Sequence, residues 1–338
     1  MLVFKTLVIG AGTMGTVHAH AYEKLTNVEL VGIVDHNFPK AQKLAEQVGV
    51  KAFCTYEEAV ASIREIDVVS ICLPTPLHKE YLIKVADQGS HVVCEKPLAR
   101  TLSDAKEMIA YCQEKDVKLF VGHVVRFFPE YVRTKQLLDT NKIGTPAVVR
   151  TSRGGGFPNA SNDWYADFNS SGGLVLDMII HDFDYLRWCF GEVERVYAKS
   201  SKGRVYSRVE YALVTLRFKS GVIAHVEGTW AHQNFTTKFE IAGKSGIIEF
   251  DSSKVQPVVT GRNSSSSGGV AVPESPLKDN PYFMELQHFI QCIEKNEQPI
   301  VTAEDAVKAM EISLAALESI ETGKPVVLHE VKVKEVIR

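Results

Sequence analysis

A glycine-rich segment placed directly after an apolar run constrains this chain more than any other feature. Residues 10–15 read GAGTMG, and residues 6–9 before them read TLVI. In such a pattern the first glycine makes a tight turn and the second lets backbone N–H groups approach a pyrophosphate. The third lets the following helix pack closely on its strand. The segment therefore predicts a strand, a turn and a helix whose N-terminus binds an anion.

A carboxylate lies where a ribose-binding group is expected. Asp35 closes the next apolar run, residues 30–34, and lies twenty residues after Gly15. A carboxylate at this position accepts a hydrogen bond from the 2′-hydroxyl of NAD and repels the 2′-phosphate of NADP. We therefore predict an NAD site, while Lys40 and Lys43 leave NADP open as an alternative cofactor. The predicted cofactor-binding residues of this segment are Gly10, Gly12, Thr13, Met14, Gly15 and Asp35.

Length and composition indicate an ordinary globular protein. A length of 338 residues favours two domains, and 45% hydrophobic residues suffice for two cores. The net charge of -3 and the lack of a Lys/Arg block argue against a nucleic-acid partner, and no apolar stretch is as long as a membrane span. The chain enters its first strand without room for a secretory signal, so we expect a cytoplasmic protein. Its expected partners are a small molecule and further copies of itself.

The cysteines give no sign of a disulfide framework or a zinc site. They are widely spread and show no C-x-x-C spacing. We therefore expect reduced, mostly buried thiols. The six positions are Cys54, Cys72, Cys94, Cys112, Cys189 and Cys292.

Strand-like and helix-like segments alternate from the start of the chain to about residue 122. The predicted strands are residues 6–9, 30–34, 68–72, 91–94 and 118–121, and the predicted helices are residues 13–25, 39–48, 79–88 and 103–114. Ser103 is expected to be the N-cap of the last helix. This alternation predicts an α/β fold with a doubly wound parallel sheet, a Rossmann domain, over residues 1–122.

The pattern of predicted secondary structure changes in the rest of the chain, residues 123–338. Period-two segments at residues 209–218, 222–230 and 238–241 are separated by turn signals, which predicts an antiparallel sheet. A helix is expected from about residue 302 to residue 321. The second domain is therefore predicted to be α+β. The serine-rich segment at residues 261–269 is expected to be an exposed loop.

Two segments that follow predicted strands lie where ligands are expected to bind. Ligands of open parallel sheets bind outside the carboxyl ends of the strands. Residues 74–78 and 95–97 follow strands there and are expected to border the nicotinamide. The Lys96 ammonium can donate three hydrogen bonds toward an alcohol or carbonyl oxygen, although a solvated lysine at a strand end is the alternative. The predicted cofactor-binding residues here are Leu73, Pro74, Thr75, His78, Glu95 and Lys96.

An apolar segment carries a third group of polar residues. Residues 172–184 read as a helix entered through two glycines, and Asp177 and His181 are four residues apart, with Asp184 three further. This spacing puts them on one face. Buried there, they could be a structural pair, metal ligands, or an acid–base group with its partner. The predicted dinucleotide site favours the third of these roles, the acid–base group, because oxidation of an alcohol by hydride loss needs a base. No metal site is predicted.

The GAGTMG segment, residues 95–97 and the segment with Asp177 and His181 together resemble the Gfo/Idh/MocA family of oxidoreductases over nearly the whole chain. The family includes glucose-fructose oxidoreductase and inositol 2-dehydrogenase. The resemblance implies a Rossmann domain followed by an α+β domain with a large open, mainly antiparallel sheet, through which members form dimers or tetramers. It also implies that Lys96, Asp177 and His181 are catalytic and that the peptide bond before Pro97 is cis.

The same resemblance implies two further cofactor-site residues. Arg126 lies in the segment that links the domains, and Trp164 lies where relatives place an aromatic beside cofactor and substrate. The chain departs from the family at Thr75, where an asparagine is common, and at His123 and Val124, which replace residues that vary with substrate. These departures leave one cofactor contact and the identity of the alcohol open.

The predicted activity is NAD-dependent interconversion of a secondary alcohol of a cyclic polyol or sugar, inositol-like by family analogy, and its ketone. In this mechanism His181 takes the hydroxyl proton and Lys96 stabilises the substrate oxygen. Asp177 pairs with Lys96 or orients the imidazole. Two alternatives remain: an NAD-dependent glycoside-cleaving enzyme of the same fold, and a non-catalytic NAD-binding regulator.

Overall fold

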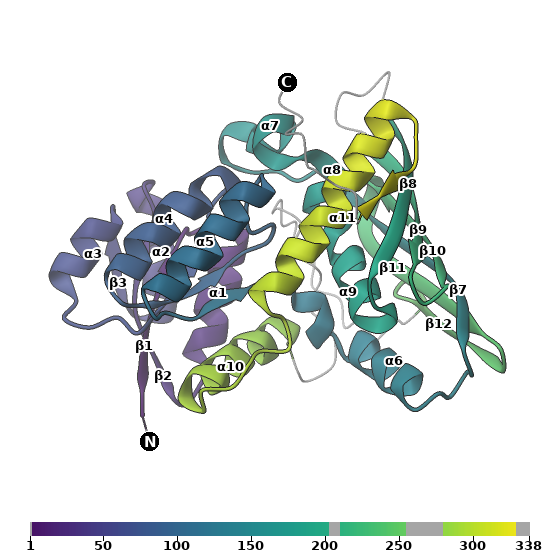
Figure 1. Cartoon of the computed structure of the whole chain (residues 1–338). Coiled ribbons are helices and arrows are strands. Elements are labelled where there is room, and N and C mark those ends of the chain that lie inside the picture. Colours follow the sequence, from purple (N-terminus) through teal and green to yellow (C-terminus); the bar gives the residue numbers. More distant parts are fainter. Residues whose placement is uncertain (1, 203–209, 255–279, 329–338) are drawn as a thin grey trace. The chain divides into compact units, whose positions relative to one another are not determined.

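The computed structural model describes residues 2–202, 210–254 and 280–328 (Figure 1). These residues form two compact units. The first unit takes the described residues of ranges 1–127 and 277–307, and the second takes those of ranges 128–276 and 308–338. The expected boundary was residue 122, so the first unit is longer than expected and includes a segment from near the C-terminus. The serine-rich segment at 261–269 lies outside the described residues.

A parallel sheet of six strands forms the centre of the first unit, in the order β3-β2-β1-β4-β5-β6. This order confirms the predicted doubly wound α/β fold. The strands are β1 (Phe4–Ile9), β2 (Val28–Val34), β3 (Lys51–Phe53), β4 (Val68–Ile71), β5 (His91–Cys94) and β6 (Leu119–Val121). The helices between them are α1 (Thr13–Glu23), α2 (Phe38–Val48), α3 (Tyr56–Ser62), α4 (His78–Asp87) and α5 (Leu102–Glu114).

Helix α5 begins earlier than expected. The Thr101 side chain accepts a hydrogen bond from the Asp104 N–H, and Thr101 itself has extended backbone. The prediction of Ser103 as the N-cap is therefore wrong. Both residues can cap a helix, but the chain turns into the helix at the earlier one, so Ser103 lies within the first turn.

Helix α10 (Pro281–Glu294) brings a distant part of the chain into the core of the first unit. It lies beside α1 (Figure 1). Leu286, Phe289 and Ile290 are buried in the same apolar cluster as residues of the sheet. The Phe289 ring stacks on Phe120 of β6 with centroids 4.8 Å apart. This packing explains why residues near the C-terminus belong to the first unit.

The second unit is built on a sheet of seven strands, in the order β12-β11-β7-β10-β9-β8-β13. All neighbouring pairs are antiparallel except β7 and β10, so the sheet is mixed but mainly antiparallel, which confirms the predicted α+β class. The strands are β7 (Pro146–Gly156), β8 (Val193–Lys202), β9 (Glu210–Phe218), β10 (Ile223–Thr229), β11 (Ala231–Gly243), β12 (Gly246–Asp251) and β13 (Val326–Val327).

The two faces of this sheet differ in burial. On β9, Val214 and Leu216 are fully buried, whereas Tyr211 and Leu213 are 36% and 40% exposed. Such alternation is expected where one face packs on helices and the other does not. The helices of this unit are α6 (Pro129–Asp139), α7 (Phe168–Ser171), α8 (Gly173–Asp177) and α9 (Ile180–Phe190), and α11 (Ala303–Thr322) starts in the first unit and continues into the second.

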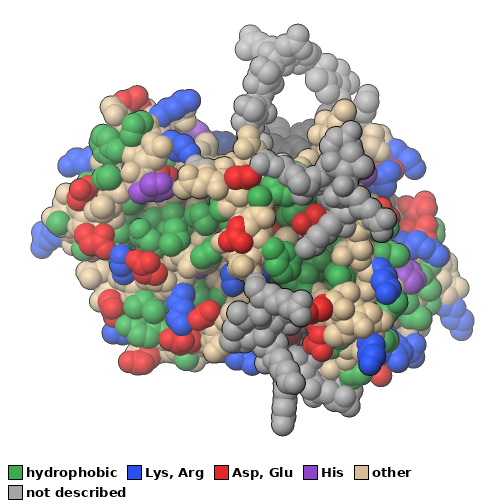
Figure 2. Space-filling model, turned by 90° about the horizontal axis from the view of Figure 1, so that it is seen from above, with side chains coloured by type: hydrophobic (Ala, Val, Ile, Leu, Met, Phe, Trp, Pro, Cys, Tyr) green, Lys and Arg blue, Asp and Glu red, His purple; other side chains and the backbone are tan. Residues whose placement is uncertain are grey.

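Opposite charges are interspersed on the face shown in Figure 2. Among the ion pairs of the first unit, the Lys79 Nζ lies 2.7 Å from Asp104 Oδ1 and 2.6 Å from Glu107 Oε2. Exposed pairs of this kind contribute at most about 1 kcal/mol each, so the stability of each unit depends mainly on its apolar core. In the part of the chain that the structure describes, every helix is too short or too polar to cross a membrane.

Replacing Phe289 by alanine tests the role of α10 in the first unit. Phe289→Ala removes a fully buried ring, so we expect the free energy of unfolding to fall by about 3–5 kcal/mol in urea denaturation. Met284→Ala on the same helix is the control, because Met284 is 37% exposed, and its effect should stay within about 0.5 kcal/mol. Equal losses for the two variants would contradict this packing.

Candidate active site

The turn between β1 and α1 has no room for side chains at two of its glycines. Gly10 has a φ of +101°, and a Cβ atom there would lie 2.3 Å from the Cys72 carbonyl oxygen. A Cβ atom at Gly15 would lie 1.6 Å from the Gly10 carbonyl oxygen. The first and third glycines of the pattern are therefore required by the protein's own backbone.

The protein's own atoms would leave room for a side chain at the middle glycine. A Cβ atom at Gly12 would meet no atom within 4 Å, and Gly12 is exposed at the N-cap of α1. Because Gly12 has no side chain to cap the helix, the first N–H groups of α1 are available to an anion, with Thr13 exposed and Met14 partly exposed beside them. The open space at Gly12 thus fits the pyrophosphate of a dinucleotide.

Asp35 is held rigidly at the end of β2. Its Oδ2 accepts a hydrogen bond from the Ala11 N–H and its Oδ1 accepts one from the Asn37 N–H, both at 2.8 Å. Each carboxylate oxygen keeps a further acceptor site, so Asp35 can also accept from the hydroxyl groups of a ribose. The glycine turn and the Asp35 carboxylate, which the sequence predicts to form one site, therefore lie together. The residues present fit NAD.

His78 joins the two loops that follow β4 and β5. Its Nε2 lies 2.9 Å from the Leu73 carbonyl oxygen, and its Nδ1 lies 3.1 Å from the Pro97 carbonyl oxygen. Burial lowers the pKa of His78, although its hydrogen bonds to backbone oppose this effect. Pro74 and the buried Thr75 follow Leu73 and open a short 3-10 helix. The His78 imidazole thus contacts both predicted segments, and the bond between Lys96 and Pro97 is cis, as expected.

Glu95 is a buried carboxylate directly before Lys96. It is 6% exposed; its Oε1 accepts from His18 Nε2 at 3.1 Å and its Oε2 accepts from the Lys96 N–H at 3.2 Å. Burial raises the pKa of Glu95, but its interactions with His18 and Lys96 outweigh burial, so its pKa lies below the ordinary value. Glu95 is therefore ionised at neutral pH, and Lys96 lies partly exposed next to it.

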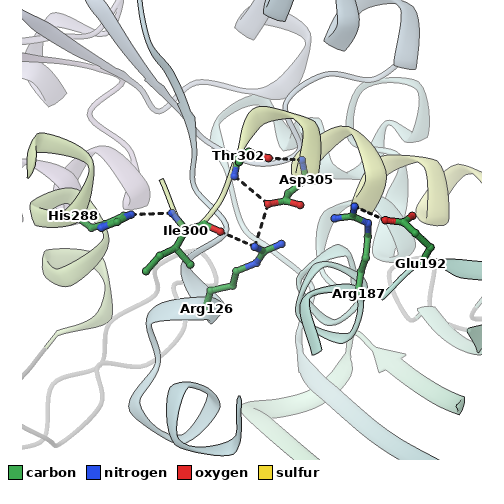
Figure 3. A network of polar contacts seen from close by, with 7 residues as sticks. All are labelled: Arg126, Arg187, Glu192, His288, Ile300, Thr302 and Asp305. Carbon is green, nitrogen blue, oxygen red and sulfur yellow. Dashed lines mark hydrogen bonds and ion pairs between the residues drawn. The ribbon is translucent and has the colours of Figure 1, made fainter. Parts of the chain in front are cut away.

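Arg126 is engaged with the protein itself (Figure 3). Its Nη1 donates to the Ile300 carbonyl oxygen at 2.7 Å and to Asp305 Oδ2 at 3.2 Å. Asp305 in turn accepts from the Thr302 N–H, and Thr302 Oγ1 accepts from the Asp305 N–H, both at 3.1 Å. This network fixes the start of α11 on the segment around Arg126, within the first unit. Sequence reasoning assigned Arg126 to the cofactor and did not foresee this structural role.

In the second unit, Asp177 and His181 lie on two helices rather than one. Helix α8 ends at Asp177 and α9 begins at Ile180, so the prediction of one continuous helix over 172–184 is wrong. The Ile179 N–H bonds to the carbonyl oxygen of Leu174, five residues back, which interrupts the α-helical pattern. Asp177 and His181 are both buried, at 8% and 7% exposed.

A buried ion pair fixes the helix that carries His181. Asp182 receives two hydrogen bonds from Arg153 of β7, from Nε at 2.6 Å and from Nη2 at 3.3 Å. Arg153 is only 1% exposed and also lies 3.4 Å from the Tyr131 hydroxyl. Sequence reasoning missed Arg153, because nothing in the spacing links it to Asp182. Asp184, expected on the same face as His181, is also buried.

Trp164 belongs to the second unit and lies in a short 3-10 helix (Ser161–Ala166). Its ring stacks on Tyr165 with centroids 4.0 Å apart. In the first unit, Gly10, Asp35, Leu73 and Glu95 all lie at the carboxyl ends of the parallel strands. Within the described ranges, no group of three or more His, Cys, Asp or Glu side chains is arranged to hold a metal ion.

Comparison with protein families covers both units. A model described as "Oxidoreductase family, NAD-binding Rossmann fold" matches residues 4–123, and one described as "Oxidoreductase family, C-terminal alpha/beta domain" matches residues 135–328. The chain belongs to the Gfo/Idh/MocA oxidoreductase family. As a member of this family, it is an oxidoreductase with an NAD-binding domain.

Similar proteins span nearly the whole chain. Myo-inositol 2-dehydrogenase of Thermotoga maritima is 33% identical over 96% of this chain and 98% of its own length. The scyllo-inositol 2-dehydrogenase (NAD(+)) of Bacillus subtilis is 30% identical over 95% of each chain. The crystal structure of a myo-inositol dehydrogenase from Corynebacterium glutamicum is 26% identical, with a TM-score of 0.83, and covers 98% of this chain and 100% of its own.

Two glycine variants separate folding from cofactor binding. Gly12→Ala places its methyl group in open space, so its melting temperature should match that of the unchanged protein. The same methyl group would crowd the pyrophosphate, so NAD binding measured by calorimetry should weaken roughly 10- to 100-fold. Gly15→Ala is the contrasting variant, because its methyl group collides with backbone, and the melting temperature itself should fall. Undiminished NAD binding by Gly12→Ala would contradict the assignment of this turn.

Proposed function

We propose that this chain interconverts a secondary alcohol of a cyclic polyol or sugar and its ketone with NAD, and that an inositol-like polyol is the first candidate. The observation that carries the proposal is the rigid turn at Gly10–Gly15 with Asp35 fixed beside it and Lys96 at a neighbouring strand end. The relatives named as inositol dehydrogenases, which align over nearly the whole chain, support the substrate class.

Several residues of the chain would hold NAD, which when bound supplies a nicotinamide ring that accepts or returns a hydride. The turn and the first N–H groups of α1 bind the pyrophosphate, and Asp35 accepts from the ribose hydroxyl groups. The preference for NAD over NADP follows from the charge of that carboxylate. The residues proposed for these contacts are Gly10, Gly12, Thr13, Met14, Gly15, Asp35, Leu73, Pro74, Thr75, His78, Glu95, Lys96, Arg126 and Trp164.

Lys96, Asp177 and His181 are proposed to carry the proton chemistry. His181 takes the proton of the substrate hydroxyl as a general base. The Lys96 ammonium donates a hydrogen bond to the same oxygen and stabilises the negative charge that develops on it. Asp177 pairs with Lys96 or holds the imidazole of His181 in its productive orientation. In the reverse direction His181 returns the proton to the carbonyl oxygen.

A panel of inositols, hexoses and sugar acids, incubated with NAD at alkaline pH, tests the proposed function. At least one polyol should produce NADH and an equal amount of ketone, because proton release favours oxidation at high pH. Release of a free sugar from a glycoside without net NADH would instead indicate a glycoside-cleaving enzyme. NAD binding without turnover of any compound would indicate a regulator. Either of these results would contradict the proposal.

His181 is the most direct target for mutation. His181→Ala should lower kcat by about 10²- to 10⁴-fold, the range expected for loss of acid–base catalysis, and should leave NAD affinity nearly unchanged. His225→Ala is the control, because His225 lies partly exposed on β10 of the same unit and contacts Thr215 Oγ1 at 3.2 Å. Steady-state kinetics and calorimetry measure both effects. Unchanged turnover in His181→Ala would remove His181 from the base role.

The chain is also proposed to act in the cytoplasm as a homo-oligomer, a dimer or a tetramer. All six cysteines are free thiols, as expected in a reducing compartment. Tyr197, Tyr211 and Leu213 expose apolar surface on the neighbouring strands β8 and β9, which favours contact with a second copy. Light scattering coupled to size-exclusion chromatography measures the mass, and a monomer at micromolar concentration would contradict this assignment.

A further inference from the structure

We propose that Arg153 and Asp182 are positioning residues for His181. Their buried ion pair sets the rotation of α9 about its axis and so the direction in which the His181 imidazole points. This inference rests on the proposed role of His181 as the general base. Asp182 is the residue after His181 in the first turn of α9, and Arg153 lies on β7. Both positioning residues act through the helix and not through contact with substrate or cofactor.

The pair of Arg153 and Asp182 is enclosed and joined at two points. Arg153 is 1% exposed and Asp182 is 3% exposed. The guanidinium donates from Nε to one carboxylate oxygen at 2.6 Å and from Nη2 to the other at 3.3 Å. Two charge-assisted hydrogen bonds to one carboxylate fix its orientation as well as its distance. The pair is therefore a directional anchor for the start of α9.

Arg153 is itself held in place. Its Nη2 lies 3.4 Å from the Tyr131 hydroxyl of α6, and its guanidinium lies over the Phe235 ring of β11, 5.9 Å from the centroid. The strand that carries Arg153, β7, lies inside the sheet between β11 and β10. A residue on such a strand is held more precisely than one on a loop. Asp182 is therefore tied to a rigid part of the second unit.

A second hydrogen bond acts on the same face of α9. The Tyr185 hydroxyl donates to the Tyr131 carbonyl oxygen at 3.0 Å. Tyr185 is three residues after Asp182, so these two side chains share one face of the helix. His181 lies about 100° away around the helix axis. Two polar anchors on one face thus determine where the neighbouring face, with His181, is directed.

The rotation of α9 needs such anchors because α9 does not simply continue α8. The helical pattern is interrupted between Asp177 and Ile180. Ile180 and Phe183 are fully buried, but hydrophobic burial is not directional. A rotation of about 10° would move a side chain that reaches about 6 Å from the axis by about 1 Å. A misplacement of about 1 Å can lower a rate about 100-fold.

Stability alone does not explain a buried ion pair at this place. Taking two charges out of water is costly, so apolar residues of similar volume often stabilise a fold equally well or better. A pair on the residue next to a candidate base is explained if it provides a defined position. The two explanations differ in what they predict when the whole pair is replaced by apolar residues.

The double variant Arg153→Met/Asp182→Val separates the two explanations. It removes both charges and roughly conserves volume, so its melting temperature should equal or exceed that of the unchanged protein. The Tyr131 hydroxyl keeps its hydrogen bond with the Thr237 side chain. With a polyol that the unchanged protein oxidises, kcat should fall about 10- to 100-fold, while NAD affinity in calorimetry stays unchanged. A purely structural pair would leave kcat unchanged in this variant.

A matched control removes another ion pair of the same helix. Near the end of α9, Arg187 Nη2 donates to Glu192 Oε1 at 2.5 Å, and Glu192 is exposed (Figure 3). Arg187→Met/Glu192→Gln should leave kcat unchanged, because this pair lies away from the first turn of α9. A loss of kcat as large as that of Arg153→Met/Asp182→Val would overturn the inference, since the effect would then not be specific to the anchor.

The position of the His181 imidazole is a readout that needs neither turnover nor cofactor. Compared with a crystal structure of the unchanged protein, that of the double variant should show the imidazole displaced by about 1 Å or in several positions. If the double variant does not fold, Arg153→Lys replaces it. An ammonium keeps the charge but cannot make the two-point contact, so the same displacement and loss of kcat are expected.

The outcomes separate this inference from the proposed function. An imidazole that stays in place, or an unchanged kcat, overturns the inference even if the unchanged protein oxidises polyols. Failure of the unchanged protein to oxidise any polyol refutes the proposed function. The crystal structures then still test whether Arg153 and Asp182 position the imidazole.

Discussion

The parallel pairing of β1 with β2 and β4 is the constraint on which the rest of the first unit depends. It brings the ends of these strands to one edge of the sheet, so the turn after β1 lies against Asp35 on one side and Cys72 on the other. A Cβ atom at Gly10 would collide with the Cys72 carbonyl oxygen, so the residue after the neighbouring strand β4 itself requires glycine there. The fold thus prepares the site before a cofactor binds.

Each of the two units has a buried, hydrogen-bonded carboxylate next to a candidate catalytic residue. Glu95 directly precedes Lys96 and is held by His18, while Asp182 directly follows His181 and is held by Arg153. In each case a buried carboxylate, bound by a side chain from another element, fixes the backbone beside the candidate residue. A pair of this kind costs desolvation, so its benefit is a defined position more than added stability.

Much of the first unit followed from the sequence, because its buried strands are continuous apolar runs and its helices have regular periodicity. β3 was missed because its three residues are too few to show a pattern. The break between α8 and α9 was missed because Met178 and Ile179 are apolar and continue the helical pattern although their hydrogen bonds do not. The sequence indicated the glycine turn and Asp35 together, because both belong to the local unit of β1, α1 and β2.

Contacts between distant parts of the chain could not be predicted in this way. The place of α10 in the first unit depends on Phe289 meeting Phe120, and the role of Arg126 depends on Ile300 and Asp305. No local pattern links these residues. For the same reason the sequence indicated Lys96 as a candidate but not His18 as the partner of Glu95.

The transfer of hydrogen from the substrate carbon tests the central claim most directly: with an inositol deuterated at the oxidised carbon, the account predicts NADH that carries the deuterium together with the matching ketone. NADH without deuterium, or a ketone formed without reduced NAD, would contradict it.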